Sequence, residues 1–213
     1  MARGKLITIE GIDGAGKSTL AGALVRELTA RGRQVELLRE PGGVDVSERI
    51  RALVKDPALA VAPRAEALLY AAARAQLVQE LLSPLLEQGT LILLDRFVDS
   101  SLAYQGAGRA LGVPEVRAIN RFATGALEPD RTLLLRISPA AGRRRQQHRA
   151  LEPDRLEREG EDFFAAIASA YDELARAEPE RIRTIDADQP PEHVLRDALA
   201  AVADLLQAPP EPG

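Results

Sequence analysis

The stretch GIDGAGKS at residues 11–18 directly follows the apolar run LITI at residues 6–9, which is typical of a short buried strand. A strand that runs into a glycine-rich turn and then into a helix near Lys17 directs several backbone N–H groups and a helix N-terminus at one place, where an anion can bind. The Lys17 ammonium can reach the β- and γ-phosphates of a nucleoside triphosphate, and the Ser18 hydroxyl can ligate Mg²⁺. A glycine-rich turn that binds nothing would not explain Lys17, Ser18 or their spacing from Gly11. The segment therefore predicts a triphosphate-binding loop, without saying what the triphosphate is used for.

Length and composition limit the class of protein. The chain has 213 residues, enough for one sizeable α/β domain, and its 46% hydrophobic and 28% charged residues are ordinary for a globular protein. No apolar run approaches the roughly 18 residues that a membrane span requires. Residues 1–5 lead into the first expected strand without room for the apolar region of a signal peptide, so we expect a cytoplasmic location. The net charge of −4 argues against a general nucleic-acid-binding surface, and the absence of cysteine excludes disulfides and thiolate metal sites.

Apolar periodicity predicts strands that alternate with helices along the chain. We expect strands at 5–10, 35–38, 91–94, 133–135 and 182–185, and helices at 17–30, 44–55, 64–88, 139–149, 160–177 and 191–206, with two more helical stretches between the third and fourth strands. This alternation is typical of a mostly parallel sheet with right-handed crossovers. The prediction is a three-layer α/β fold, with a central five-stranded parallel sheet flanked by helices. It forms a single domain over residues 1–207, and the proline-rich residues 208–213 are expected to be a disordered tail.

Three polar segments follow expected strands, and ligands of such folds gather at the carboxyl ends of the strands. These segments are the loop at 11–18, the sequence REPGG at 39–43 and the pair Asp95-Arg96. REPGG lets the backbone turn sharply toward a ligand, although a plain strand-exit turn is an alternative. The Asp95 carboxylate can hold Mg²⁺ or a metal-bound water, and the Arg96 guanidinium can bind a phosphate with two hydrogen bonds. A surface ion pair is the other interpretation, which the position after an apolar strand disfavours.

Two helical spacings predict a binding site for a planar base. Tyr70 and Arg74 are four residues apart, and Ser101, Tyr104 and Gln105 are separated by three and four, so each set shares a helix face. Aromatic residues make up only 3% of the chain, and two of its three tyrosines stand close to an arginine or a glutamine. A ring with a polar group of two hydrogen-bonding positions suits a base, which stacks on one side and bonds at its edge. Packing in the core or placement on the surface would explain the same spacings equally well.

The stretch from residue 142 to residue 160 is rich in arginine and poor in apolar residues. Its arginines are Arg143, Arg144, Arg145, Arg149, Arg155 and Arg158. Taken alone it would be a solvated charged helix. The loop residues Asp13, Gly14 and Ala15 offer no cation, however, and the charge on a transferring phosphoryl group requires one. We therefore expect a mobile lid over about residues 142–160 that brings in an arginine and excludes water.

Together these motifs resemble those of the bacterial thymidylate kinases, which belong to the P-loop nucleoside monophosphate kinases. The resemblance covers nearly the whole chain and passes through residues 11–18, REPGG at 39–43, the helix at 65–78, DRFVDSSLAYQG at 95–106 and DRLE at 154–157. The phosphate loop is shared by many enzymes, whereas Asp-Arg followed by DSSLAYQG is much more specific. The resemblance implies a P-loop kinase fold, transfer of the γ-phosphoryl group of Mg·ATP to dTMP, and a homodimer.

The resemblance also implies a role for each matching residue. ATP would bind to Gly11, Ile12, Asp13, Gly14, Ala15, Gly16, Lys17, Ser18 and Thr19, and Mg²⁺ to Ser18 and Asp95. The acceptor phosphate would be held by Arg39, Arg51 and Arg96, and the thymine edge by Arg74, Gln105 and Ser101. Tyr70 would stack on the base and Tyr104 would crowd the place of a ribose 2′-OH. Asp13 and Glu40 would lie beside the sugar, the acceptor phosphate and the metal. The catalytic residues would be Lys17, Arg96, Arg149 and Arg155, the last two acting from the lid.

Two positions depart from the family pattern. Tyr70 stands where the family generally has a stacking phenylalanine, and Phe97 where it usually has a tyrosine, so both positions keep a ring.

The sequence leaves two alternative functions open. The first is a kinase of the same fold that acts on another nucleoside monophosphate, which the spacings do not exclude. The second is a nucleotide-binding switch that hydrolyses its nucleotide slowly and signals by a change of shape. A switch would not need a second phosphate site or a base site next to the loop.

Overall fold

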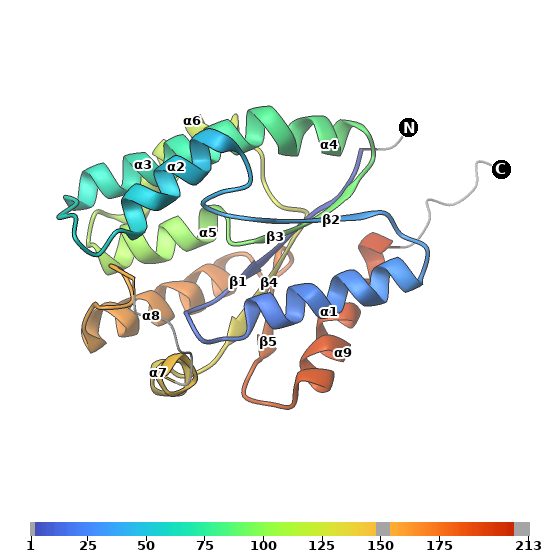
Figure 1. The fold of residues 1–213 in the computed structure, drawn as a ribbon. Helices are drawn as coiled ribbons and strands as arrows, with labels where there is room; N and C mark the ends of the chain where they lie inside the picture. The colour runs from blue at the N-terminus through green and yellow to red at the C-terminus, as the bar shows by residue number, and fades with distance from the viewer. Residues whose placement is uncertain (1–2, 148–153, 207–213) are drawn as a thin grey trace.

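The protein is described by a computed structural model that covers residues 3–147 and 154–206 (Figure 1). Within these residues, one sheet has the strand order β2-β3-β1-β4-β5, and every neighbouring pair is parallel. The strands are β1 (Leu6–Glu10), β2 (Val35–Arg39), β3 (Leu91–Asp95), β4 (Arg131–Arg136) and β5 (Ile182–Asp186). The predicted five-stranded parallel sheet is thus confirmed.

The helices fill the intervals between the strands, as predicted. They are α1 (Lys17–Ala30), α2 (Asp45–Lys55), α3 (Pro63–Leu77), α4 (Ser83–Glu87), α5 (Val98–Ser101), α6 (Val113–Thr124), α7 (Pro139–Gln147), α8 (Glu161–Ala177) and α9 (Pro191–Ala201). Two π-helical segments, η1 (Val78–Leu82) and η2 (Leu102–Gly108), continue α3 and α5, and a 3₁₀ turn, η3 (Ala203–Leu206), follows α9. None of these described helices is long and apolar enough to cross a membrane.

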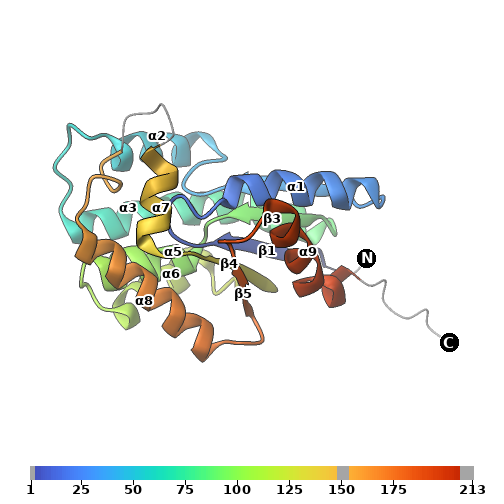
Figure 2. The same ribbon diagram turned by 90° about the horizontal axis from the view of Figure 1, so that it is seen from below.

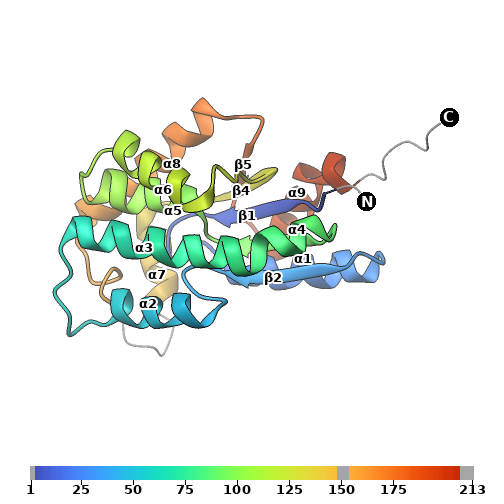
Figure 3. The same ribbon diagram turned by 90° about the horizontal axis from the view of Figure 1, so that it is seen from above.

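The sheet lies between two layers of helices. Seen from below and from above, α1 and α9 lie together over one face, whereas α3, α4, α6 and α8 lie over the other (Figures 2 and 3). The apolar side chains of β1 alternate between these layers: Leu6 packs in the cluster with Leu77 and Leu86, and Ile7 in the cluster with Leu24. Burying one such side chain contributes about 1.5–3 kcal/mol. The continuous apolar runs of the central strands are therefore needed because both of their faces are covered.

The expected helix at 64–88 is interrupted by a wide turn. The structure divides this stretch into α3, the π-helical η1 and α4, although the path continues in one direction (Figure 3). Pro84 lies just after η1 and explains the change, because proline has no N–H and its ring clashes with the carbonyl group of the residue four positions before it. The sequence prediction therefore gave the extent of this helical stretch correctly and missed its π-helical segment.

Strand register brings the predicted motifs to one edge of the sheet. Asp95 is paired with Ile9 of β1 and with Arg39 of β2, so the three strand ends lie at the same level. The glycine-rich loop, REPGG and Asp95-Arg96 leave the sheet from these neighbouring strands. Of the predicted lid, residues 142–147 belong to α7 and residues 154–160 lead into α8, whereas residues 148–153 lie outside the described residues. The predicted tail at 208–213 also lies outside them.

Candidate active site

The glycine-rich loop wraps around the Lys17 side chain. Lys17 Nζ donates hydrogen bonds of 3.0 Å to the carbonyl oxygens of Gly11 and Ile12. Gly14 has a φ of 83°, and a Cβ there would lie 2.3 Å from the carbonyl oxygen of Gly142, so the loop packs directly against α7. Burial and the nearby Arg96 charge lower the pKa of Lys17 to about 8, against the opposing effect of neighbouring carboxylates. The ammonium is thus preorganised in the loop, and its charge is easily lost at alkaline pH.

Ser18 and Asp95 meet at the first turn of α1. The Ser18 hydroxyl donates to Asp95 Oδ2 over 3.1 Å, and both residues line the same cavity. A hydroxyl beside a carboxylate supplies oxygen ligands of the kind that Mg²⁺ prefers when it is held together with phosphates. The two residues predicted to hold the metal are therefore adjacent.

Asp13 receives hydrogen bonds from two side chains of the segment that follows β3. Arg96 Nη2 donates to Asp13 Oδ1, and the Tyr104 hydroxyl donates to Asp13 Oδ2 over 2.9 Å. Burial alone would raise the pKa of Asp13, but the charges of Arg96 and Lys17 outweigh it and hold this pKa well below its usual value. Arg96 has a φ of 72°, a conformation that non-glycine residues rarely adopt and that is found at functional sites. Asp13 is consequently a fixed anion between two cations.

Glu10, which the sequence prediction missed, holds this segment in place. Its side chain is completely buried and accepts hydrogen bonds from the Phe97 N–H over 2.7 Å, from the Ser100 hydroxyl and from the Tyr171 hydroxyl over 2.9 Å. Burial raises the pKa of Glu10, as does the nearby Asp99 carboxylate. These contacts fix the turn that presents Arg96. An acidic residue in an otherwise apolar strand, next to the loop, was the available sequence signal.

The REPGG segment and α2 carry two arginines that face the cavity. Arg39 is exposed and pairs with Glu48 over 3.2 Å, and Glu48 also accepts from the Gly43 N–H over 2.9 Å. Arg51 Nη1 donates to the carbonyl oxygen of Pro41 over 2.8 Å. Burial lowers the pKa of Arg51, and the positive charge of Arg39 lowers it further. Two neighbouring guanidinium groups of this kind are suited to binding an anion such as a phosphate.

Arg74 is the most constrained of the predicted substrate-binding residues. Its side chain is 2% exposed and donates to Glu40 Oε2 over 2.7 Å, to the Ser101 hydroxyl over 2.9 Å and to the Phe97 carbonyl oxygen over 2.9 Å. It also donates to Asn120 Oδ1. Burial raises the pKa of Glu40 to about 7, although Arg74 opposes this shift, and Glu40 Oε1 is buried without a hydrogen-bond partner among the described residues. Arg74 is thus held by protein groups on several sides, which fixes its place in the cavity wall.

The lid-side wall is formed by residues of the motif DRLE at 154–157, to three of which sequence reasoning assigned no role. Asp154, Leu156 and Glu157 line the cavity, and Asp154 pairs with Lys55 Nζ over 2.7 Å. Arg155 does not line it. Its guanidinium lies 2.7 Å from Glu66 Oε2, and its Nε donates to the Val54 carbonyl oxygen over 3.0 Å. Arg149, the other predicted lid arginine, lies outside the described residues.

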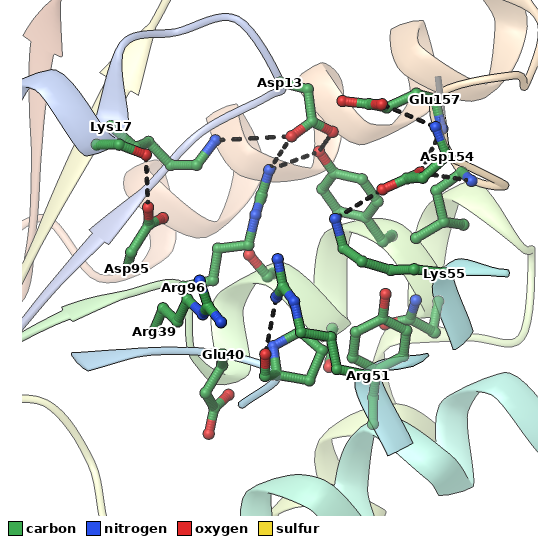
Figure 4. A pocket seen from close by; sticks show the side chains of 18 of the residues that line it. Asp13, Lys17, Arg39, Glu40, Arg51, Lys55, Asp95, Arg96, Asp154 and Glu157 are labelled. Carbon is green, nitrogen blue, oxygen red and sulfur yellow. Dashed lines mark hydrogen bonds and ion pairs between the residues drawn. The ribbon is translucent and has the colours of Figure 1, made fainter. Parts of the chain in front are cut away.

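One cavity of about 270 Å³ connects these groups (Figure 4). Figure 4 shows Lys17 and Arg96 converging on Asp13 at one end, with Arg39, Glu40 and Arg51 at the other. Of the predicted residues, the structure brings together Asp13, Gly14, Gly16, Lys17, Ser18, Arg39, Glu40, Arg51, Tyr70, Arg74, Asp95, Arg96, Ser101, Tyr104 and Gln105. Gly11, Ile12, Ala15, Thr19 and Arg155 are not part of its lining.

The fold and this cavity define a class of protein. A glycine-rich loop follows β1 in a parallel sheet, and across one cavity it faces Arg39, Arg51 and a wall that contains Tyr70, Arg74 and Gln105. This arrangement is that of a P-loop kinase. Comparison with known proteins identifies the family within the class.

The thymidylate kinase family model matches residues 9–198. A thymidylate kinase of Deinococcus radiodurans is 45% identical over 204 residues, which cover 96% of this chain and 98% of the relative. One of Lactobacillus delbrueckii subsp. bulgaricus is 46% identical over 190 residues, 88% of this chain and 90% of the relative. The crystal structure of a thymidylate kinase from Ehrlichia chaffeensis is similar with a TM-score of 0.78 and 25% identity, covering 94% of this chain and 99% of that one. The chain belongs to the thymidylate kinase family, which confirms the resemblance noted in its motifs.

Proposed function

We propose that this chain transfers the γ-phosphoryl group of ATP to dTMP, giving ADP and dTDP. The observation that carries the proposal is a single cavity that joins Lys17, in the phosphate loop, to the wall containing Tyr70 and Gln105. The triphosphate would lie on residues 11–18. The monophosphate would lie between the arginines at 39, 51 and 96, with its base against the wall.

The reaction requires alignment and charge neutralisation more than proton transfer. An oxygen of the acceptor phosphate attacks the γ-phosphorus, the bond from this phosphorus to the β–γ bridging oxygen breaks, and ADP leaves with the electron pair. The acceptor phosphate needs no strong general base, and no covalent enzyme intermediate is expected. Lys17 and Arg96 stabilise the charge that develops on the transferred group, because both are cations held in place before the substrates arrive.

The proposal includes Mg²⁺ bound together with ATP. Ser18 Oγ and Asp95 Oδ2 lie 3.1 Å apart in the cavity and fit a hard cation that prefers oxygen ligands. Among the described residues there is no cluster of three or more metal-ligating side chains, so the triphosphate would complete the coordination. When bound, Mg²⁺ would neutralise part of the triphosphate charge. Ser18 and Asp95 would hold it beside the loop.

The lid completes the proposed site. The Gly14 backbone already packs against Gly142 at the start of the predicted lid, and Leu156, near the other end of the lid segment, lines the cavity. Closure over the cavity would exclude water, which otherwise competes as acceptor. Arg149 as a catalytic cation stays a prediction. Arg155 as a catalytic cation also stays a prediction, and in the structure its guanidinium lies 2.7 Å from Glu66 Oε2.

An acceptor assay tests the proposed function directly. Coupled measurement of ADP release with dTMP, dUMP, CMP and AMP should give the highest kcat/KM for dTMP. A weaker reaction with dUMP is expected because contacts with the thymine methyl supply only about 1–3 kcal/mol. Faster use of CMP would favour a kinase of another nucleoside monophosphate. A nucleotide-binding switch predicts that no monophosphate binds beside ATP and that ADP release is independent of the acceptor.

We propose a homodimer as the assembly. The apolar side chains Leu53, Leu68 and Phe122 are 48%, 56% and 91% exposed. They lie on α2, α3 and α6, which pack one against the next. Burial of these side chains against a second copy would stabilise association. Light scattering after chromatography should give twice the chain mass for the wild type and a smaller mass for Phe122→Glu, and a monomeric wild type would contradict the dimer.

We also propose a cytoplasmic location, where ATP and dTMP are available as substrates. Fractionation of the source cells followed by immunoblotting tests this. The chain should be recovered in the cytosolic fraction, and recovery in the membrane or secreted fraction would contradict the proposal.

A further inference from the structure

Glu66 is a completely buried carboxylate behind the base wall. It lies on α3, one helical turn before Tyr70, and its side chain is 0% exposed. Oε1 accepts from Gln105 Nε2 over 2.9 Å and from Arg109 Nε over 3.3 Å. Oε2 accepts from Arg109 Nη2 over 3.2 Å and lies 2.7 Å from Arg155 Nη2. One carboxylate thus joins two guanidinium groups and an amide that come from separate parts of the chain.

The contact with Glu66 fixes the orientation of the Gln105 amide. A glutamine amide can be turned so that either its NH₂ group or its carbonyl oxygen faces a neighbour. The ionised carboxylate only accepts hydrogen bonds, so the NH₂ group must face Glu66. The Gln105 carbonyl oxygen is left as an acceptor in a residue that lines the cavity. An acceptor there suits a base with an N–H at ring position 3, which thymine and uracil have and cytosine lacks.

The same carboxylate holds the C-terminal end of the predicted lid in place. Besides its ion pair with Glu66, Arg155 donates through its backbone N–H to the Lys55 carbonyl oxygen over 3.4 Å and through Nε to the Val54 carbonyl oxygen over 3.0 Å. Arg109, the second guanidinium on Glu66, donates to Glu159 over 2.6 Å. Both ends of residues 155–159 are therefore fixed to one cluster, and Leu156 and Glu157 between them line the cavity.

We infer that Glu66 is a positioning residue that sets base selection through Gln105 and holds the lid-side wall through Arg155 and Arg109. The inference rests on the proposed function, since it concerns recognition of the acceptor base. Glu66 does not line the cavity itself. It links the part of the cavity that recognises the base to residues 155–159 at the C-terminal end of the predicted lid, because its oxygens contact residues of both. Loss of its charge would remove the anion beside the partly buried Arg155 guanidinium and leave Arg109 with its second partner, Glu159.

Glu66→Gln tests the base-selection half of the inference. A neutral amide at this position accepts or donates, so the Gln105 amide is no longer forced into one orientation. The ratio of kcat/KM for dTMP to that for dCMP should fall by about tenfold or more, because a site with a fixed acceptor rejects a base without the matching donor. The KM for ATP should change by less than about threefold. A merely structural role would lower the melting temperature but leave the dTMP to dCMP ratio unchanged, and that result would overturn the inference.

Two further variants keep the test decisive if Glu66→Gln does not fold. Glu66→Asp retains the charge for the arginines but is one methylene shorter, so the dTMP to dCMP ratio should fall in the same direction. Arg155→Gln leaves Gln105 and its contact with Glu66 in place, so it should raise the KM for dTMP without changing that ratio. An unchanged dTMP to dCMP ratio in Glu66→Asp would contradict the role of Glu66 in base selection. An unchanged KM for dTMP in Arg155→Gln would contradict the role of Glu66 in holding the lid-side wall.

Asp130→Asn is the matched control. Like Glu66, Asp130 is a carboxylate with a cation and an amide N–H as partners, although it is only partly buried: it accepts from Lys5 Nζ over 2.8 Å and from the Leu6 backbone N–H over 2.9 Å. Asp130 lies just before β4, at the amino ends of the strands and away from the cavity. Its substitution should affect stability but not the dTMP to dCMP ratio. The wild-type assay separates the two proposals. A wild type that does not phosphorylate dTMP refutes the proposed function, whereas an active wild type with an unchanged ratio in the Glu66 variants refutes only the role of Glu66.

Discussion

Arg96 donates a hydrogen bond to Asp13, which ties the residue after β3 to the phosphate loop after β1. Arg96 also donates to the Gly11 carbonyl oxygen over 3.1 Å, and its guanidinium lies 5.0 Å from the centre of the Tyr104 ring. Burial by itself would lower the pKa of Arg96, but Asp13 and other neighbouring groups raise it well above its usual value. The cation therefore stays charged and aimed at the loop at any pH at which the enzyme works.

Replacing Arg96 by glutamine should lower kcat by about 10²–10³-fold, the typical effect of removing one preorganised group that stabilises developing charge. Glutamine at a φ of 72° has the same kind of backbone strain as arginine, so relief of strain does not confuse the result. Steady-state kinetics and thermal unfolding of the purified variant provide the measurement. A kcat within about threefold of the wild type, in a folded variant, would exclude Arg96 from the catalytic step.

The pKa of Lys17, lowered to about 8, predicts a loss of ATP use at alkaline pH. The charged form binds phosphate and predominates below this pKa, so the charge is lost as pH rises through about 8. Because kcat/KM reports ionisations of the free enzyme, kcat/KM for ATP should fall about tenfold per pH unit above that point. Lys17→Arg keeps its charge and should remove this decline even though its kcat is lower. A profile for the wild type that stays flat to about pH 9.5 would contradict the assignment.

The sequence predicted the sheet and the place of the site because both depend on local patterns. Continuous apolar runs mark buried parallel strands, and the carboxyl ends of such strands are neighbours whatever their order in the chain. The loop, Asp95 and Arg96 were found from this rule, and the register of β1, β2 and β3 brings them together. The four-residue spacing of Tyr70 and Arg74 likewise predicted a shared face, and both line the cavity.

What the sequence did not predict depends on contacts between distant segments. The spacing that drew attention to Tyr70 extends back one turn to Glu66, but nothing local shows that Gln105, Arg109 and Arg155 meet there. In the same way, the partners of Arg74 come from α5, from α6 and from the turns that follow β2 and β3. The packing of distant segments decides which residues surround a buried charged side chain. Periodicity in the sequence does not indicate which residues these are.

Asp95→Asn should weaken the binding of Mg²⁺ in the active site. The amide keeps the shape of the side chain and still accepts from the Ser18 hydroxyl, but it loses the negative charge that attracts a divalent cation. The Mg²⁺ concentration for half-maximal rate at fixed ATP should rise by about tenfold. Titration of Mg²⁺ against initial rate measures it, with Asp130→Asn again as the control. An unchanged Mg²⁺ midpoint would remove Asp95 from the metal site.

Tyr70 provides the sharpest test of base stacking, because the structure shows no hydrogen bond from its hydroxyl among the described residues and burial raises its pKa. Stacking of a base on an aromatic ring is worth about 1–3 kcal/mol, so Tyr70→Leu should raise the KM for dTMP by about 5- to 150-fold while kcat changes less. Tyr70→Phe retains the ring and should keep most of the affinity. If the leucine and phenylalanine variants bound dTMP equally well, the ring would have no stacking role. Titration calorimetry of dTMP with each variant separates the loss of binding from any loss of turnover, since a stacking ring lowers the free energy of the bound base before the phosphoryl group moves.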